Sequence, residues 1–209
     1  MMIFYKIVNK VRYLINKKYN KKYEESLRKR LKNDNFSIIC SNCVGGVIYN
    51  RLGRKFLSPT INLWMHQQDF LKFVEKLRDY TALDLEFVDS EYDYPVALLG
   101  DIKIHFNHYK TEREAEECWN RRKSRINYDN LFIIMYERDN ITVDDFRILE
   151  NIECKNKIVF SDKRHPDIDY IVTMETSNRQ NGQQCLDRDW LGRRTFEKQF
   201  DYVKWLNCE

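Results

Sequence analysis

Six consecutive large apolar residues at 131–136, LFIIMY, constrain the fold more than any other feature of the sequence. A strand with one face in water alternates apolar and polar residues, whereas this run has no polar side. We therefore expect a strand that is buried on both faces of its sheet. Apolar runs of strand length at 36–40, 157–160 and 170–174 predict further strands.

Between these runs, the sequence changes to helical patterns. Apolar residues at helical spacing or capping residues mark the segments 44–52, 69–80, 111–125, 143–149 and 196–206. Buried strands that alternate with helices predict an α/β fold with three layers, α/β/α, around a largely parallel, Rossmann-like sheet. The run at 96–106 is divided at Gly100-Asp101 and predicts either a hairpin or a single bulged strand.

The first 35 residues form a distinct, basic part of the chain. They hold eleven Lys or Arg against three acids, a local charge of +8, whereas the whole chain carries +4 and the remainder therefore −4. Ile3, Ile7, Val11 and then Leu14 or Ile15 recur at helical spacing, which predicts an amphipathic basic helix. We expect residues 1–35 to be this N-terminal segment and residues 36–209 to be one α/β domain.

Two roles are open for the basic segment. It can pack on the main domain and continue as a solvated, lysine-rich connector, or it can bind an anionic membrane surface. No nucleic-acid partner is expected, because the main domain is acidic and shows no nucleic-acid-binding motif. Six irregularly spaced cysteines, no visible signal peptide and no apolar run of about 18 residues predict a cytoplasmic protein, with peripheral attachment at the inner face of the membrane as an option.

The turn SNCVGG, residues 41–46, is the first candidate site. Cys40 ends an apolar run and reads as a core residue, so neither a redox pair nor a zinc half-site with Cys43 is favoured. Cys43 falls in a strand-to-helix turn, where it is either a nucleophile or a space-filling residue. Ser41, Asn42, Gly45 and Gly46 are candidates for binding a phosphate or carboxylate at the start of the following helix.

Two histidines follow in the segment DIKIHFNHYK. One of them, His105 or His108, is a candidate base for Cys43, and Lys110 nearby is a candidate phosphate ligand. Hydrogen-bonded histidines at a sheet edge are the alternative explanation. Arg122, in a basic helical segment, is a further candidate phosphate ligand, although such charges usually pair with neighbouring acids.

Glu137 and Asp139 directly follow the LFIIMY strand, at the sheet edge where α/β proteins bind ligands. Their spacing is that of the acidic Asp-x-Asp element with which many nucleotide-sugar transferases hold a divalent metal. We consider them candidate ligands of Mn²⁺ or Mg²⁺, against the alternative of a solvated turn. No tightly bound organic cofactor is implied.

Four segments together resemble a known family: SNCVGGVIYNRLG, FLSPTINLWM, DIKIHFNHYKTEREAEECWNRR and RINYDNLFIIMYERD. They are similar to a bacterial family of domain-of-unknown-function proteins found among exopolysaccharide and capsule biosynthesis proteins, whose members are often labelled glycosyltransferases without a settled activity. The resemblance covers residues 36–206 and leaves out the basic segment. The family keeps a cysteine at the position of Cys43 but usually not at that of Cys40, which argues against a functional pair.

The resemblance implies a role in making surface polysaccharide, and it leaves open whether the protein is an enzyme. The first hypothesis is transfer of a sugar from a nucleotide-sugar donor to a glycan precursor. The second is acyl transfer to a glycan from an acyl donor, with Cys43 as nucleophile and His105 or His108 as base. The third is a non-catalytic, glycan-binding or scaffold component of the assembly machinery.

Overall fold

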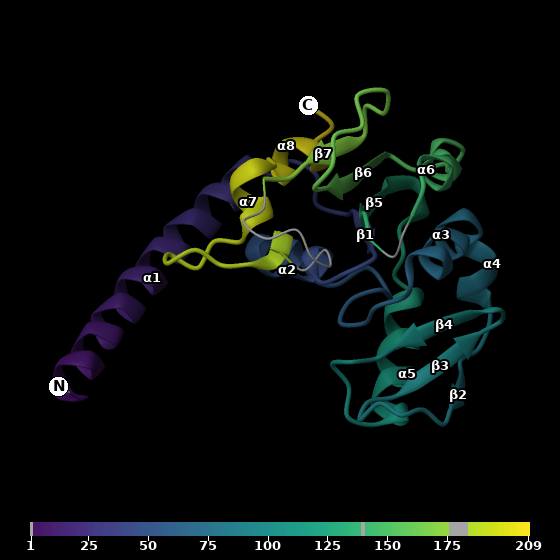
Figure 1. Cartoon of the computed structure of the whole chain (residues 1–209), viewed down its shortest axis with the longest axis horizontal. Helices are drawn as coiled ribbons and strands as arrows, with labels where there is room; N and C mark the ends of the chain where they lie inside the picture. The colour runs from purple at the N-terminus through teal and green to yellow at the C-terminus, as the bar shows by residue number, and fades with distance from the viewer. Residues whose placement is uncertain (1, 139–140, 176–183) are drawn as a thin grey trace.

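Four parallel strands form the centre of the protein (Figure 1). The computed structural model describes residues 2–138, 141–175 and 184–209, with side chains for all of these except 2–9 and 184. The strands lie in the order β1-β5-β6-β7, namely Ser37–Cys40, Leu131–Tyr136, Asn156–Ser161 and Ile171–Thr173. The predicted α/β class with its parallel sheet is confirmed.

Helices cover both faces of this sheet. Successive residues of a strand point to opposite faces, and in β5 Phe132 and Ile134 belong to one hydrophobic core whereas Ile133 and Met135 belong to the other. The first core is completed by α1 (Met2–Arg30), α2 (Val44–Leu52), α7 (Thr195–Gln199) and α8 (Tyr202–Leu206). The second is completed by α3 (Gln67–Glu75), α4 (Leu77–Ala82), α5 (Glu112–Lys123) and α6 (Val143–Glu150).

A second, antiparallel sheet lies beside α5 in Figure 1. It consists of β2 (Glu86–Val88), β3 (Val96–Leu99) and β4 (Ile102–His105). Of the two alternatives for residues 96–106, the hairpin is the one observed, with Gly100 at a φ of 62° in its turn. Apolar residues of this sheet share the core of α3 to α6, so the two sheets have one continuous interior.

Two predicted helices are each divided into two. The helix expected over 69–80 is interrupted at Lys76, whose φ of −121° and ψ of 43° are not helical. The helix expected over 196–206 is interrupted at Phe200, which is extended, and Asp201 then caps α8 by accepting a hydrogen bond from the Lys204 N–H. The extended backbone places the Phe200 ring against Phe160, with ring centroids 5.4 Å apart, and this packing explains the break.

The basic segment is one helix rather than a helix followed by a connector. α1 continues through its lysine pairs to Arg30, and its second half packs on the domain, where Leu27 is buried in the core of α2 and α8. Its first half extends away from the rest of the protein (Figure 1). Among the described residues, no helix combines the length and the apolar character needed to span a membrane.

The connections of β1 and β5 diverge at the carboxyl edge of the parallel sheet. β1 leads into α2 on one face, whereas its neighbour β5 leads into α6 on the opposite face. In parallel α/β sheets, ligands bind where adjacent strands diverge in this way. Residues that follow Cys40 and Tyr136 therefore occupy the best-placed position for a site.

Candidate functional site

Three polar segments meet at this carboxyl edge. Arg138, after β5, donates a hydrogen bond to the backbone carbonyl of Ser41, after β1, over 3.3 Å. Glu137 accepts a hydrogen bond from the hydroxyl of Ser161 at the end of β6. The segments 41–46, 137–138 and 161–165 thus form one continuous edge, and they divide into a thiol half and a carboxylate half.

The thiol half contains Cys43 and His108. The sulfur of Cys43 lies 3.7 Å from Nε2 of His108, which is exposed and comes from the loop between β4 and α5. Of the two histidines considered as a base for Cys43, the structure places His108 beside the thiol. A sulfur and an imidazole nitrogen at this separation can exchange a proton.

Burial keeps Cys43 protonated. It raises the pKa of the thiol, and the positive charges of Arg194 and Arg138 lower it by less than burial raises it. At neutral pH the group is therefore a thiol, and reaction as a nucleophile requires His108 to accept its proton. This arrangement differs from the low-pKa thiolate that a helix N-terminus alone would favour.

The turn before α2 uses its own polar groups. Oδ1 of Asn42 accepts a hydrogen bond from the Val44 N–H over 2.9 Å and one from the Cys40 thiol over 3.3 Å. The backbone N–H of Gly45 hydrogen-bonds the Cys40 sulfur, and the hydroxyl of Ser41 accepts from the Tyr136 N–H over 3.2 Å. Because these donors already have partners, the start of α2 has fewer N–H groups left for an anion than the sequence suggests.

Gly45 and Gly46 lie in the interior and face protein. A Cβ on Gly45 would lie 3.0 Å from the Cβ of Cys40, so α2 approaches β1 more closely than a larger residue permits. A Cβ on Gly46 would be 3.5 Å from Ile61, an ordinary contact. Gly45 therefore serves the packing of helix on strand, and nothing at this position requires a ligand.

His105 is separated from the thiol and lies among aromatic rings. Its ring stacks on Trp64 with centroids 3.8 Å apart, and Tyr92 and His66 meet it edge-on. Neither ring nitrogen has a hydrogen-bond partner among the described residues. Burial lowers the pKa of His105 to about 4, helped by the nearby positive potentials of His66 and Lys103, so the ring is neutral at neutral pH.

The two predicted phosphate ligands outside the turn occupy different positions. Arg122 is buried and donates hydrogen bonds to the carbonyl of Ile61, over 2.7 Å, and to the hydroxyl of Tyr109. It joins α5 to the segment after α2, and both of its partners are buried residues, so its guanidinium serves the interior of the protein. Lys110 is exposed, and its backbone N–H donates to Glu114 at the start of α5.

The carboxylate half is centred on Glu137, whose side chain is only 5% exposed. Oε1 accepts from Nζ of Lys163 over 2.8 Å, and Oε2 accepts from Ser161 and from Nε2 of His165, the latter over 2.9 Å. Burial raises the pKa of this carboxyl, but the hydrogen bonds from Lys163, Ser161 and His165 outweigh it and the pKa is lowered. Glu137 is therefore an ionised carboxylate, and both of its oxygens accept hydrogen bonds.

This environment does not fit a divalent cation. Both oxygens of Glu137 already accept hydrogen bonds, two of them from side chains that carry or can carry positive charge, and a metal would have to displace them. Asp139, the second predicted ligand, lies outside the described residues. Within 2–138, 141–175 and 184–209, no group of three His, Cys, Asp or Glu side chains is arranged to hold a metal ion.

Two arginines of the thiol half were missed by sequence reasoning. Arg138 lies next to the predicted Glu137, donates to the Met65 carbonyl over 2.6 Å and acts electrostatically on Cys43. Arg194 precedes α7 and acts on the same thiol, although about 150 residues separate them in sequence. The position after β5 is a signal for Arg138, whereas no local pattern indicates Arg194.

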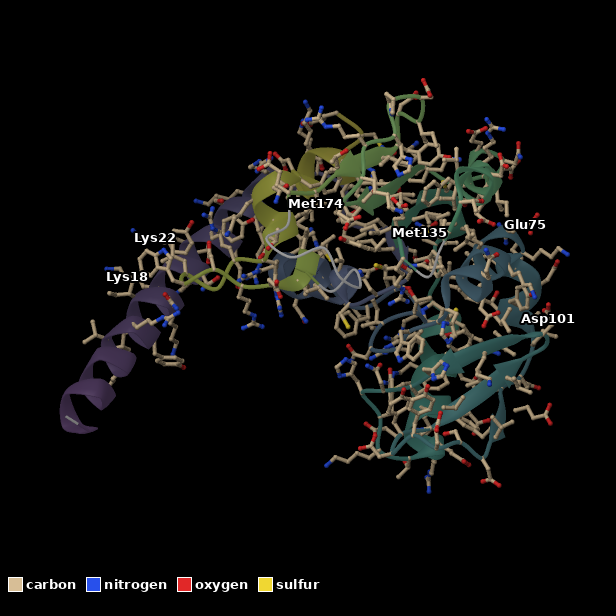
Figure 2. The ribbon with its side chains drawn as sticks, in the orientation of Figure 1. Lys18, Lys22, Glu75, Asp101, Met135 and Met174 are labelled. Carbon is tan, nitrogen blue, oxygen red and sulfur yellow. The ribbon has the colours of Figure 1, made fainter. Side chains whose placement is uncertain are left out.

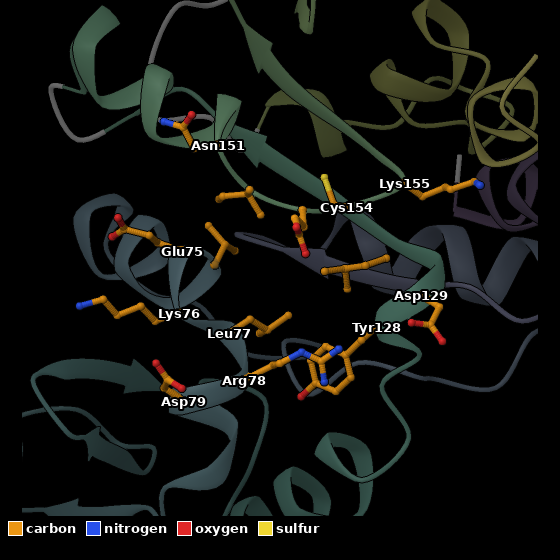
Figure 3. A pocket seen from close by; sticks show the side chains of 14 residues that line it. Glu75, Lys76, Leu77, Arg78, Asp79, Tyr128, Asp129, Asn151, Cys154 and Lys155 are labelled. Atoms are coloured by element: carbon orange, nitrogen blue, oxygen red, sulfur yellow. The ribbon is translucent and has the colours of Figure 1, made fainter.

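A well-defined cavity lies elsewhere, at the amino edge of the parallel sheet. It has a volume of about 570 Å³ and is lined by the end of α3, α4, the residues before β5 and the residues before β6 (Figure 3). Its charged residues have both signs, and Arg78 stacks on the Tyr128 ring at 3.9 Å. Because ligands of parallel α/β sheets bind at the opposite edge, we do not assign the candidate site here.

Comparison with known proteins identifies relatives of the whole chain. A family model described as "Domain of unknown function (DUF1919)" matches residues 14–207. A protein of Haemophilus influenzae, named "Uncharacterized protein", is 38% identical over 201 residues, which cover 95% of this chain and 97% of the relative. The match begins within α1, earlier than the 36–206 of the sequence resemblance, so part of the basic helix is common to the family. The chain belongs to the DUF1919 family.

Proposed function

We propose that the protein is a transferase of surface-polysaccharide biosynthesis that moves a group from an activated donor to a glycan precursor. The resemblance of its four motifs to exopolysaccharide and capsule proteins supports the pathway. One observation supports the chemistry: Cys43 Sγ lies 3.7 Å from His108 Nε2 at the point where β1 and β5 diverge. This pair favours acyl transfer.

The reaction has two steps. In the first, His108 takes the thiol proton of Cys43 while the sulfur attacks the carbonyl carbon of an acyl thioester, and the departing donor thiolate leaves with that proton. In the second, a glycan hydroxyl attacks the acyl-cysteine, and its proton passes through His108 to the released Cys43 sulfur. An ester on the glycan forms, and the free thiol is restored.

The positive charges near the Cys43 thiol suit a donor that carries phosphate. Arg138 and Arg194 both act on this thiol and come from different parts of the chain, the end of β5 and the residue before α7. A guanidinium binds phosphate oxygens through paired N–H donors. A phosphate-bearing thioester such as an acyl-coenzyme A would place its reactive carbonyl near the thiol by such contacts.

Sugar transfer from a nucleotide sugar is the second candidate. The same two arginines and the same position, where β1 and β5 diverge, suit a nucleotide diphosphate. The metal-assisted form of this reaction requires Glu137 and Asp139 as ligands. It is the weaker candidate because Glu137 already has Lys163, Ser161 and His165 as partners.

Mass spectrometry of the intact protein after incubation with acyl-coenzyme A thioesters tests the first candidate. We expect one added acyl group in the wild type and none in Cys43→Ala, with a large loss in His108→Gln. Cys154→Ala is the matched control, because Cys154 is another half-buried thiol whose pKa burial raises. Acylation that persists in Cys43→Ala would overturn the acyl-transfer mechanism.

Thermal stability distinguishes the two donors. A ligand at about a hundred times its dissociation constant stabilises the folded state by roughly 2.7 kcal/mol. A shift with a nucleotide sugar that requires Mn²⁺ and disappears in Glu137→Gln would select sugar transfer. If neither donor class shifts the melting temperature of the wild type, both proposed reactions fail and a non-catalytic role in glycan assembly gains support.

A further inference from the structure

α1 has two faces with different environments. One face packs on the domain: Asn16 and Asn20 donate hydrogen bonds to the carbonyls of Trp190 and Leu191, both over 2.8 Å, and Leu27 is 3% exposed. These residues recur at spacings of four and seven, which places them on one side of the helix. The side that faces the domain is therefore fixed by contacts.

The opposite face carries an exposed apolar stripe. Val11, Leu14 and Ile15 are 51%, 55% and 48% exposed. Val11 precedes Asn20 by nine residues, about two and a half helical turns, so it points away from the domain. The sequence continues the same spacing back to Ile7 and Ile3. The fold of this chain does not bury these apolar side chains, because the domain lies on the other side of the helix.

Basic residues accompany this stripe, and the first acids in the sequence, Glu24 and Glu25, follow it. Residues 1–22 contain no Asp or Glu, and their seven basic residues are Lys6, Lys10, Arg12, Lys17, Lys18, Lys21 and Lys22. At 100° per residue, Lys18 and Lys22 lie on the same side of the helix as Val11. Both lysines are labelled on α1 in Figure 2. Up to Glu25, which continues the same line, the outer face thus combines an apolar strip with positive charge alone.

We propose that this outer face of α1, defined by Val11, Leu14, Ile15, Lys18 and Lys22, docks on an anionic lipid bilayer. An interfacial helix buries an apolar strip among the headgroups while lysines meet lipid phosphates. The strip is one-sided, which suits a helix lying in the surface plane. The inference does not depend on the proposed transferase reaction.

Charge argues for lipid over the other occupants. Two copies joined along this stripe would bring fourteen basic residues together, twice the seven of one chain, without an acid in residues 1–22 to pair with them. Nucleic acid would satisfy the lysines but would leave the apolar strip in water. A bilayer rich in anionic lipid satisfies both parts of the surface.

Co-sedimentation of the full chain with vesicles tests the proposal. We expect binding to vesicles of equal parts phosphatidylglycerol and phosphatidylcholine, and little binding to phosphatidylcholine alone. Lys18→Gln/Lys22→Gln should weaken binding about 25-fold, since each basic residue near the surface contributes about five-fold. Leu14→Gln/Ile15→Gln should weaken it at least about ten-fold, because buried apolar area is lost while charge is unchanged.

Matched variants on other surfaces serve as controls. Leu83→Gln removes an apolar side chain of similar exposure, 42%, and Lys103→Gln/Lys155→Gln removes two exposed lysines. Both should bind vesicles as the wild type does. The proposal is overturned if the wild type ignores anionic vesicles, if the α1 variants bind unchanged, or if sedimentation velocity shows a dimer that the Leu14/Ile15 variant dissociates. Circular dichroism confirms that the variants remain folded.

Discussion

The two halves of the carboxyl edge show opposite uses of polar side chains. Glu137 is buried, and both of its oxygens are occupied by groups from β6 and the loop after it. Cys43 is half-buried, and its one side-chain hydrogen-bonding contact among the described residues is with the exposed His108, at a longer distance of 3.7 Å. Both oxygens of Glu137 are therefore occupied by neighbouring side chains, whereas the thiol of Cys43 has only a long contact with an imidazole.

This contrast separates residues that hold the edge together from residues that are available to a ligand. A carboxylate that satisfies Lys163, Ser161 and His165 fixes the loop between β6 and β7, and displacing those partners costs free energy. The protonated thiol of Cys43 makes only the 3.7 Å contact with His108 among the described side chains, although Arg138 and Arg194 nearby each donate to a backbone carbonyl. Position in the sequence does not show which half is the better candidate site, since both halves follow buried strands.

The largest expected effect is the loss of the Glu137 carboxylate. Glu137→Ala should lower the free energy of unfolding by about 3 kcal/mol, because it removes a buried carboxylate that accepts from Lys163, Ser161 and His165. Chemical denaturation at neutral pH measures this. The pKa of Glu137 is lowered in the folded state, so its contribution is present above the ordinary carboxyl pKa and disappears as pH falls through the folded value. A variant as stable as wild type would show that this half is not structural.

A second effect concerns His105, which the structure separates from the thiol. Its folded pKa of about 4 lies below the ordinary 6.5, so the unfolded chain binds more protons between these values and stability falls as pH decreases. Between about pH 7 and pH 5 the loss should be about 2 kcal/mol. His105→Phe keeps an aromatic ring against Trp64 and should remove this component of the pH dependence. An identical pH profile in the variant would contradict a buried, neutral His105.

The paired glycines give a smaller and internally controlled effect. Gly45→Ala should destabilise the fold by about 1 kcal/mol, since its Cβ would press on Cys40 at 3.0 Å. Gly46→Ala meets only an ordinary contact at 3.5 Å and should be neutral or stabilising by up to about 1 kcal/mol through helix propensity. Urea denaturation of both variants measures the difference. Equal effects would remove the packing explanation for Gly45.

The smallest expected effect on stability is at Cys43. Cys43→Ser should change the free energy of unfolding by less than about 0.5 kcal/mol, because the thiol is half-buried and makes one long polar contact. Its alkylation by iodoacetamide should be slow at neutral pH and should accelerate as pH rises toward its raised pKa. Fast alkylation at neutral pH would show a preformed thiolate and a different electrostatic setting.

Much of the fold follows from local pattern. The all-apolar β5 predicts its own burial, and Thr111 and Thr142 predict helix starts that the structure confirms, with their hydroxyls accepting from Glu114 N–H and Asp145 N–H. These features depend on neighbours three or four residues away. The break at Phe200 was not predicted, because it accompanies packing against the distant Phe160. The break at Lys76 was not predicted either, and the structure offers no explanation for it.

The candidate site was predicted in outline and not in detail. The sequence places 41–46 and 137–139 on one sheet edge because strand ends converge in a parallel sheet, and contacts between Ser41 and Arg138 bear this out. It does not distinguish His105 from His108 as the neighbour of Cys43. That choice depends on where β4 ends, since the strand holds His105 against Trp64 while the following loop carries His108 to the thiol.

The sequence by itself determined the α/β class, the buried parallel strands and the basic character of the first helix, because each depends on composition and periodicity along a short stretch. Tertiary structure alone decided that Glu137 is enclosed by Lys163 and His165, that Arg194 acts on Cys43, and that the stripe of Val11 faces away from the domain. These facts join residues far apart in the chain. Their free energies depend on distance and burial in space, which spacing along the sequence does not encode.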